Sequence, residues 1–203
     1  MGAVDFGIVV DGAVVIIEAI LQRISAPDGA HPSVPGVDES LTMTERIGPE
    51  AESRLYFVHD GLFPHFNWRT TPDGRTYHGQ GGPPGSVDGR WGSDEFLIRQ
   101  GQQRHLLQVG YADTLLGQLF DRLQAEGIWD DAMIVVTADH GIAFTADHDK
   151  RTPNDETVDE IYRVPMFIRV PGEREGEVSD ENAMNIDVLP TIVDVLGIHT
   201  DWE

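Results

Sequence analysis

The sequence predicts an α/β protein, because segments with the pattern of buried strands alternate with segments that have the pattern of helices. Residues 133–138 form a nearly continuous apolar run, which is typical of a strand that is buried on both faces of a sheet. Residues 94–125 instead carry apolar side chains at spacings of three and four, which indicates a long amphipathic helix. The alternation favours a mostly parallel sheet flanked by helices.

Shorter elements precede and follow these two. Residues 55–59 form an apolar run that predicts a strand before a loop rich in Gly and Pro, and residues 165–170 predict a further strand. Gly127 is expected to end the long helix, since glycine readily adopts the left-handed conformation that closes helices. Asp187 is placed to cap a last helix that ends at Gly197.

Three parts of unequal character follow one another along the chain. Residues 1–24 are dominated by an apolar run at 6–21, residues 25–50 have the Pro and Gly content of a linker, and residues 51–203 carry the α/β pattern. The apolar run lacks the preceding positive charge of a signal peptide. It is also short for a membrane span, and its two carboxylates are costly in lipid.

The chain is strongly acidic, with 35 Asp and Glu against 14 Lys and Arg and a net charge of −21 at pH 7. Such a charge repels nucleic acid and anionic membrane surfaces, so nucleic acid is not an expected partner. It also repels a sulfate or phosphate ester unless a cation or a local cluster of Arg and Lys offsets the field. A surface adapted to high salt has a similar composition. Because the chain has no Cys, any metal site is built from Asp, Glu, His, Asn or hydroxyl groups.

Asp139 and His140 directly follow the buried strand, at the point where a turn begins. Side chains at the carboxyl end of a strand in an open α/β sheet face the ligand crevice. A carboxylate and an imidazole there can bind a divalent cation, and Gly141 lets the backbone turn without crowding it. The alternative interpretation is structural, with Asp139 as a cap and His140 as an ordinary loop histidine. Spacing alone leaves both interpretations open.

Five separated blocks of the sequence resemble the superfamily of sulfatases, phosphodiesterases and phosphoglycerol transferases. In order they read YFVHDGLFPHFNW, QRHLLQVGY, VVTADHG, VPMFIRVPG and IDVLPTIVDVLGI, and they cover most of residues 54–203. The likeness extends to the soluble domain of actinobacterial membrane proteins. It implies an alkaline-phosphatase-like sandwich of which this chain holds the C-terminal part, incomplete at its N-terminus.

The resemblance implies roles for three of the residues already noted or nearby. Asp139 and His140 become ligands of a divalent metal, which can be calcium, manganese or zinc. His65 matches a histidine that approaches the substrate anion or the leaving group, where an imidazole can donate to a developing oxyanion. The alternative for His65 is a loop histidine packed on Trp68.

The stretch TADHDKR lies where relatives place cationic or imidazole side chains over the substrate, and it offers His148, Lys150 and Arg151. Lys and Arg are scarce in this chain, so two adjacent ones are notable. They can neutralise a sulfate or phosphate group. An ordinary solvated loop is the alternative interpretation.

The N-terminal segment has two interpretations of its own. The resemblance implies an Asp at the end of the first strand and a hydroxyl nucleophile further on, for which Asp11 with Thr42 or Thr44 is a candidate set, although the interval to the next block is far shorter than the family needs. Residues 4–18 are separately similar to a transmembrane helix of heavy-metal efflux pumps of the resistance–nodulation–division class. This second likeness points to a chimeric N-terminus.

Taken together, the resemblance implies a metal-dependent hydrolase or transferase of sulfate or phosphate esters, weakly active or inactive as this fragment. It also implies a membrane-associated protein with an extracytoplasmic catalytic domain. Two alternatives stay open. One is a non-catalytic remnant that binds metal or anions, and the other is a membrane-anchored module that associates with the bilayer through residues 6–21.

Overall fold

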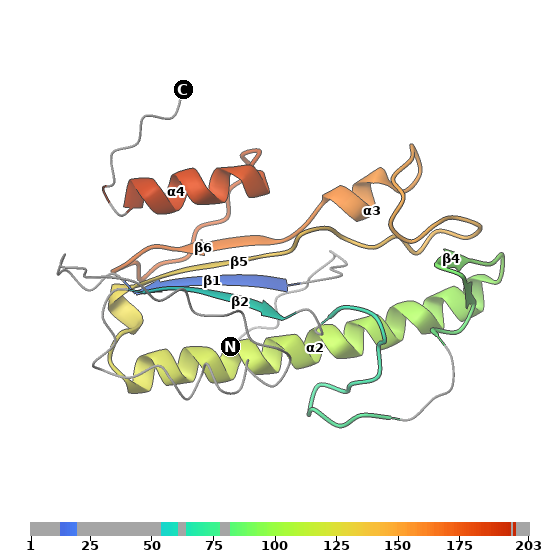
Figure 1. Cartoon of the computed structure of the whole chain (residues 1–203), viewed down its shortest axis with the longest axis horizontal. Helices are drawn as coiled ribbons and strands as arrows, with labels where there is room; N and C mark the ends of the chain where they lie inside the picture. Colours follow the sequence, from blue (N-terminus) through green and yellow to red (C-terminus); the bar gives the residue numbers. More distant parts are fainter. Residues whose placement is uncertain (1–12, 20–53, 61–63, 78–81, 196, 198–203) are drawn as a thin grey trace, which may run out of the picture. The chain divides into compact units, whose positions relative to one another are not determined.

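The computed structural model describes residues 13–19, 54–60, 64–77, 82–195 and 197 (Figure 1). The chain divides into two compact units, and one dividing point lies inside a long helix, between Gly117 and Gln118. The first unit contains Ala13 and the described residues within 60–117 and 138–165. The second unit contains the described residues within 14–59, 118–137 and 166–203.

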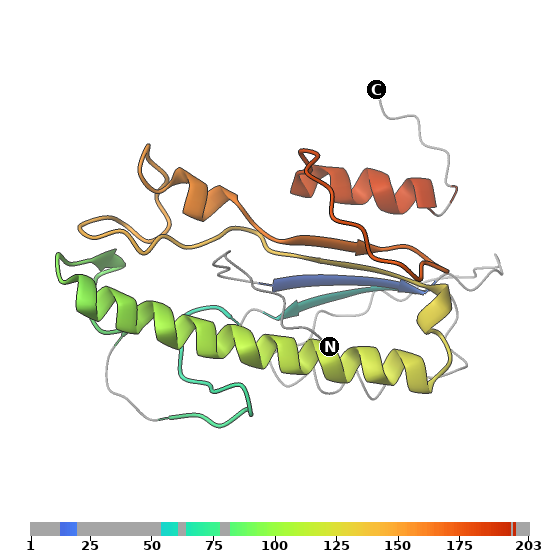
Figure 2. The same cartoon turned by 180° about the vertical axis from the view of Figure 1, so that it is seen from behind.

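A four-stranded sheet forms the basis of the second unit, with the strand order β2, β1, β5, β6 (Figure 2). The strands are β1 at Ala13–Ala19, β2 at Arg54–Asp60, β5 at Ala132–Thr137 and β6 at Met166–Arg169. The three strands predicted from apolar runs are confirmed as β2, β5 and β6. Strand β5 is the most deeply buried of those with described side chains, because five of its six residues are buried.

The prediction of a mostly parallel sheet is wrong for the strand pairs whose register is described. Strand β1 is antiparallel to β5, with Val15 opposite Val136, and β5 is antiparallel to β6, with Val135 opposite Ile168. Parallel neighbours need a crossover connection, usually a long helix, that returns the chain to the same end of the sheet. Here the only described helix between β5 and β6 is the five-residue α3 at Val158–Tyr162, and the chain re-enters the sheet in the opposite direction.

Residues 13–19 form a strand and not part of a helix, so the likeness of residues 4–18 to a transmembrane helix does not hold for this segment. Val14 to Ile17 are four consecutive β-branched residues, and such residues favour extended backbone. Residues 4–12 and the expected linker at 25–50 lie outside the described residues. None of the helices in the described part of the chain combines the length and the apolar content needed to cross a membrane.

Helix α4 at Val188–Val195 covers one face of the sheet in the second unit (Figure 1). Its buried residues Val188 and Ile192 pack against Met133 and Val135 of β5. Each such side chain removed from water contributes about 1.5 to 3 kcal/mol. The predicted last helix is therefore confirmed. The carboxylate of Asp187, which was expected to cap this helix, accepts a hydrogen bond from the amide of Met184 at 2.8 Å, at the start of the preceding 3₁₀ helix Asn185–Asp187.

The long helix α2 runs from Glu95 to Ala125, as its apolar periodicity predicts. Asp94 caps it, since Oδ1 of Asp94 accepts hydrogen bonds from the amides of Phe96 and Leu97 at 3.0 and 3.2 Å. At the other end, Gly127 has a φ of 73° and closes the helix as predicted. The 3₁₀ helix Trp129–Asp131 then leads into β5.

An aromatic cluster forms the core of the first unit. Trp68 and Trp91 are 2% and 1% exposed, and their rings stack with centroids 6.4 Å apart. Ile98 and Ile142 are buried with them. The close approach of helix α2 depends on Gly101, because a Cβ atom there would lie 2.6 Å from the ring of Trp91. This core carries the segments that bear the candidate functional residues.

Candidate active site

A tight hairpin in the first unit organises the site. Strands β3 at Ser86–Val87 and β4 at Arg90–Trp91 pair antiparallel and are joined by Asp88 and Gly89, whose φ angles are 48° and 83°. Positive φ at both turn residues matches the right-handed twist of a hairpin, and the Asp-Gly pair is favoured for it. The sequence prediction placed these residues in a loop and missed the hairpin, although Asp-Gly was a usable signal.

Beside the hairpin lies a cavity of about 560 Å³. That volume is in the range of small-molecule sites, which is about 300 to 1,000 Å³. Its walls come from four separate segments of the first unit. The lining residues are His65, Phe66, Gly82, Ser86, Asp88, Gly89, Ile142, Asp149, Lys150, Arg151 and Thr152.

The cavity brings together His65, Lys150 and Arg151, three of the residues singled out from the sequence. Nη2 of Arg151 lies 2.7 Å from Nε2 of His65, and Nδ1 of His65 lies 3.0 Å from the carbonyl oxygen of Phe66. Because a guanidinium can only donate and a carbonyl can only accept, this geometry assigns the proton of His65 to Nδ1 and leaves a lone pair on Nε2. His65 is therefore a proton acceptor at Nε2 in this arrangement.

Lys150 is 7% exposed and donates a hydrogen bond to the hydroxyl of Ser86. Its backbone amide donates to the carbonyl of Gly89 at 3.2 Å, which ties the Lys150 segment to the tip of the hairpin. Two carboxylates also line the cavity, those of Asp88 and Asp149. Asp149 is paired with Arg90 at 3.5 Å. The sequence prediction missed Ser86, Asp88 and Asp149, because nothing in the sequence placed the hairpin against residues 149–152.

His148 is not among the described residues that line the cavity. Its Nδ1 lies 2.8 Å from the carbonyl of Ala146, and its Nε2 lies 3.7 Å from Glu156. The carbonyl of His148 accepts a hydrogen bond from the amide of Trp91 at 3.0 Å. In this structure, His148 thus helps to attach the hairpin to the loop that carries Lys150.

Asp139 and His140 form a close pair just after β5 and likewise are not among the described lining residues. Oδ2 of Asp139 lies 3.7 Å from Nε2 of His140, and Oδ1 of Asp139 accepts the amide of His140 at 2.9 Å. Nδ1 of His140 lies 2.8 Å from the carbonyl of Gly141. An Nδ1–H that donates to a backbone carbonyl leaves Nε2 with its lone pair, which is the usual arrangement of a metal-binding histidine.

The pair supplies two of the oxygen and nitrogen donors that a divalent metal uses. Both side chains are accessible, with 54% of Asp139 and 32% of His140 exposed. Within the described ranges, no group of three or more His, Asp or Glu side chains comes together in a way that could hold a metal. Asp139 and His140 therefore fit a metal as part of a ligand set, not as a complete one.

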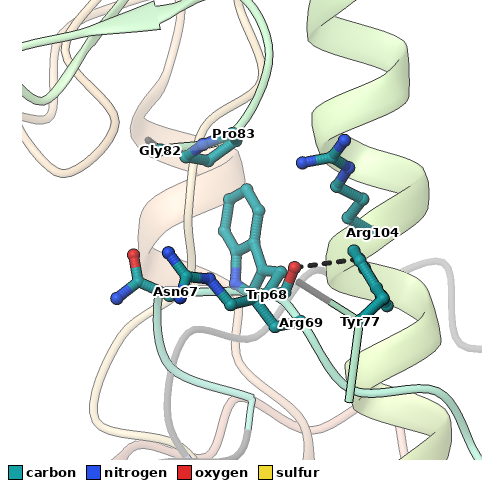
Figure 3. A pocket seen from close by; sticks show the side chains of 7 residues that line it. All are labelled: Asn67, Trp68, Arg69, Tyr77, Gly82, Pro83 and Arg104. Atoms are coloured by element: carbon teal, nitrogen blue, oxygen red, sulfur yellow. Dashed lines mark hydrogen bonds between the residues drawn. The ribbon is translucent and has the colours of Figure 1, made fainter. Parts of the chain in front are cut away.

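A second, much smaller cavity lies beside Trp68, with a volume of about 10 Å³ (Figure 3). The hydroxyl of Tyr77 donates to the carbonyl of Trp68 at 2.9 Å, and the guanidinium of Arg104 lies 5.7 Å from the Tyr77 ring. Burial raises the pKa of Tyr77, and the positive charge of Arg104 partly opposes this. Since a single water needs about 10 to 15 Å³, this cavity is too small for an ester and is structural.

These features define an α/β protein with a strand-end Asp–His pair and a cavity that is lined by His65, Lys150 and Arg151. The chain belongs to the sulfatase family, whose sequence model matches residues 45–198. Membership confirms the resemblance at the level of the family and, with it, an alkaline-phosphatase-like α/β fold. The comparisons lend no support to the finer likenesses to actinobacterial membrane proteins and to an efflux-pump helix.

Three relatives illustrate the range of the family. The multifunctional alkaline phosphatase superfamily protein PehA of Trinickia caryophylli is 31% identical over 156 residues, which are 75% of this chain and 27% of that protein. Lipoteichoic acid synthase 2 of Bacillus subtilis is 34% identical over 44% of this chain and 15% of its own length. N-acetylglucosamine-6-O-sulfatase of Bacteroides thetaiotaomicron is 33% identical over 49% of this chain and 18% of its own length. The chain thus spans about a quarter of PehA and less of the other two. No solved structure matches it.

Proposed function

We propose that this chain takes part in the hydrolysis or transfer of a sulfate or phosphate ester, with the ester anion held in the 560 Å³ cavity. One observation carries the proposal: His65, Lys150 and Arg151 converge on one cavity in a chain whose net charge is −21. Relatives named as an alkaline phosphatase superfamily protein and as a sulfatase support the ester chemistry.

Two cations of the cavity can attract an anion. The overall negative charge of the chain repels sulfate and phosphate, so a binding site for them needs cations close to the bound group. Of the two carboxylates that line the cavity, that of Asp149 is paired with Arg90, which offsets its charge. Arg151 offers a planar guanidinium that can form two parallel hydrogen bonds to an oxyanion, and Lys150 offers a buried ammonium. Both act more strongly in a partly enclosed cavity than in open solvent, because the local dielectric is lower.

His65 is the proposed proton carrier. Its Nε2 holds a lone pair directed at Arg151, so it can take a proton in the cavity. Once protonated, Nε2 can donate to the oxygen of the leaving group as the ester bond breaks. An anion that draws Arg151 to itself would free Nε2 of His65 for this exchange.

Sulfatase-family domains generally use a divalent metal, and Asp139 and His140 are the residues of this chain that would hold it. Such an ion, whether calcium, manganese or zinc, neutralises the ester oxygens when bound. The nucleophile candidates Thr42 and Thr44 lie outside the described residues. Because no group of three or more metal-binding side chains comes together within the described ranges, we propose weak or no turnover by this chain alone.

Calorimetric titration with sodium sulfate and sodium phosphate tests the anion site. The expected result is binding by the parent chain and a loss of at least about tenfold in affinity for Lys150→Met, because the lost contact is charge-assisted. Arg163→Met is the matched control, since Arg163 is 74% exposed and paired with Asp159 outside the cavity. Equal affinity in all three proteins would overturn the proposal.

A non-catalytic anion-binding protein is the second candidate, favoured by the incomplete metal ligand set among the described residues. The two functions differ in turnover. Assays with p-nitrophenyl sulfate and p-nitrophenyl phosphate, with each metal added, separate them. Sulfate binding without metal-dependent release of p-nitrophenol would favour the non-catalytic function.

A further inference from the structure

Lys150 is the only lysine among the 203 residues of the chain. Lysine is normally a surface residue, but Lys150 is only 7% exposed. A buried charge is costly unless other groups compensate it. The surroundings of this one ammonium group therefore show what holds it in place.

Three side chains of the described part of the chain contact the ammonium. Nζ of Lys150 lies 4.7 Å from the centre of the Trp91 ring and 5.0 Å from that of Phe66, both within the range of cation–π attraction. It also donates to the hydroxyl of Ser86. We call Phe66, Ser86 and Trp91 the lysine cage.

The walls of the lysine cage are themselves fixed. Trp91 is 1% exposed, and its ring nitrogen donates to the carbonyl of Ala143 at 2.7 Å. The amide of Ser86 donates to the carbonyl of Pro83 at 3.2 Å. In the opposite direction, the Lys150 amide donates to Gly89 at the tip of the hairpin. Hairpin and loop are thus joined by bonds from both sides, and two of the three cage residues, Ser86 and Trp91, are held by hydrogen bonds of their own.

We propose that the lysine cage positions the ammonium of Lys150 at the wall of the cavity and thereby sets the affinity for an anion. A lysine has a flexible four-carbon stem, and a free one loses conformational freedom when it binds a ligand. Restraint by the cage removes that loss in advance. Trp91 does not line the cavity among the described residues, so it acts only through Lys150, as a positioning residue. The effect on anion affinity rests on the proposed function, whereas the positioning of the ammonium does not.

Amine labelling tests the positioning directly, because the chain has one lysine to label. The acetylation rate of Lys150 by N-hydroxysuccinimidyl acetate is measured by mass spectrometry and expressed relative to the urea-unfolded chain. In Ser86→Ala the relative rate should rise by about tenfold, the factor expected for one lost hydrogen bond to a charged group. Ser86→Thr keeps the hydroxyl and should label like the parent. Ser93→Ala is the matched control, since Ser93 is exposed and lies just beyond the hairpin.

Sulfate titration of the same variants tests the consequence. Affinity should fall by about tenfold in Ser86→Ala and stay near the parent value in Ser86→Thr and Ser93→Ala. If Ser86→Ala labels like the parent, the positioning by the cage is overturned, whatever the titration gives. If labelling changes as expected but the parent binds neither sulfate nor phosphate, the cage stands and the proposed function fails. If labelling changes and the parent binds sulfate but Ser86→Ala binds it equally well, the link from the cage to affinity is overturned.

Discussion

The guanidinium of Arg151 lies 2.7 Å from Nε2 of His65, a residue 86 positions earlier in the chain. This contact joins the segment that carries His65 to the loop that carries Lys150, at the wall of one cavity. Because arginine is only a donor, the contact also fixes which nitrogen of His65 accepts. In the proposed function, this one pair of side chains would therefore couple the binding of an anion to the movement of a proton.

A double-mutant cycle measures that coupling. His65→Phe and Arg151→Met should each weaken sulfate binding, and the double variant should lose less than the sum of the two, with a coupling of about 0.5 to 3 kcal/mol. Calorimetric titration of the four proteins gives the coupling free energy. Strict additivity would contradict a functional link between the two residues.

Metal binding at Asp139 and His140 should appear as thermal stabilisation. A ligand that binds only the folded state at 100 times its Kd raises the free energy of unfolding by about 2.7 kcal/mol. Melting curves with calcium, manganese and zinc should show this effect for at least one ion, and Asp139→Asn with His140→Gln should abolish it. If no metal changes the melting temperature of the parent, the assignment of Asp139 and His140 as metal ligands is contradicted.

The raised pKa of Tyr77 predicts a loss of folding stability at alkaline pH. Burial raises its pKa above the ordinary value of 10.0, so the folded state keeps the phenol proton more tightly than the unfolded state. The stability that this proton provides is complete below the unfolded pKa and is lost as pH rises through the folded pKa. Melting temperatures from pH 8 to 11 should fall less steeply above pH 10 for Tyr77→Phe than for the parent. The same slope in both proteins would be the contrary result.

The packing of α4 on β5 predicts unequal costs for two neighbouring truncations. Ile192→Ala removes a side chain that is 4% exposed and should lower the free energy of unfolding by about 2 to 5 kcal/mol. Leu189→Ala, at a residue that is 55% exposed, should change it by about 0.5 kcal/mol or less. Urea unfolding of both variants checks the difference, and similar costs would contradict the placement of the helix.

Salt should stabilise the chain. At a net charge of −21 the folded state suffers self-repulsion, which dissolved ions screen over about 3 Å at 1 M salt. The melting temperature should rise steadily as KCl is increased toward 2 M. A comparison with an equal concentration of an uncharged osmolyte separates screening from general exclusion effects, and a salt-independent melting temperature would contradict the prediction.

The parts of the fold that the sequence predicts well are those with a local cause. Helix α2, its end at Gly127 and strand β5 each follow from residues within a single segment. Strand direction has no such local cause, because an apolar run reads the same whether its neighbour is parallel or antiparallel. The antiparallel pairing of β5 with β6 therefore had to come from the structure.

The candidate site divides in the same way. His65, Lys150 and Arg151 are visible in the sequence as motifs, and the structure places them on one cavity. Ser86 was not visible, because strands of two residues have no periodicity and because its contact with Lys150 spans 64 positions. Asp139 and His140 stand out by their place directly after the buried strand, and His148 by the resemblance, yet none of the three is among the described residues that line the cavity.

The burial of Lys150 has a further use, as a measure of local opening. A lysine-specific protease has a single bond to cut in this chain, the one that follows Lys150. Cleavage there requires the ammonium to leave the lysine cage and the loop to separate from the hairpin. When opening and closing are fast relative to cleavage, the cutting rate reports the population of the open form. A bound anion that engages Lys150 would slow that cut, so resistance to one protease would follow occupancy of the cavity without any chromogenic substrate.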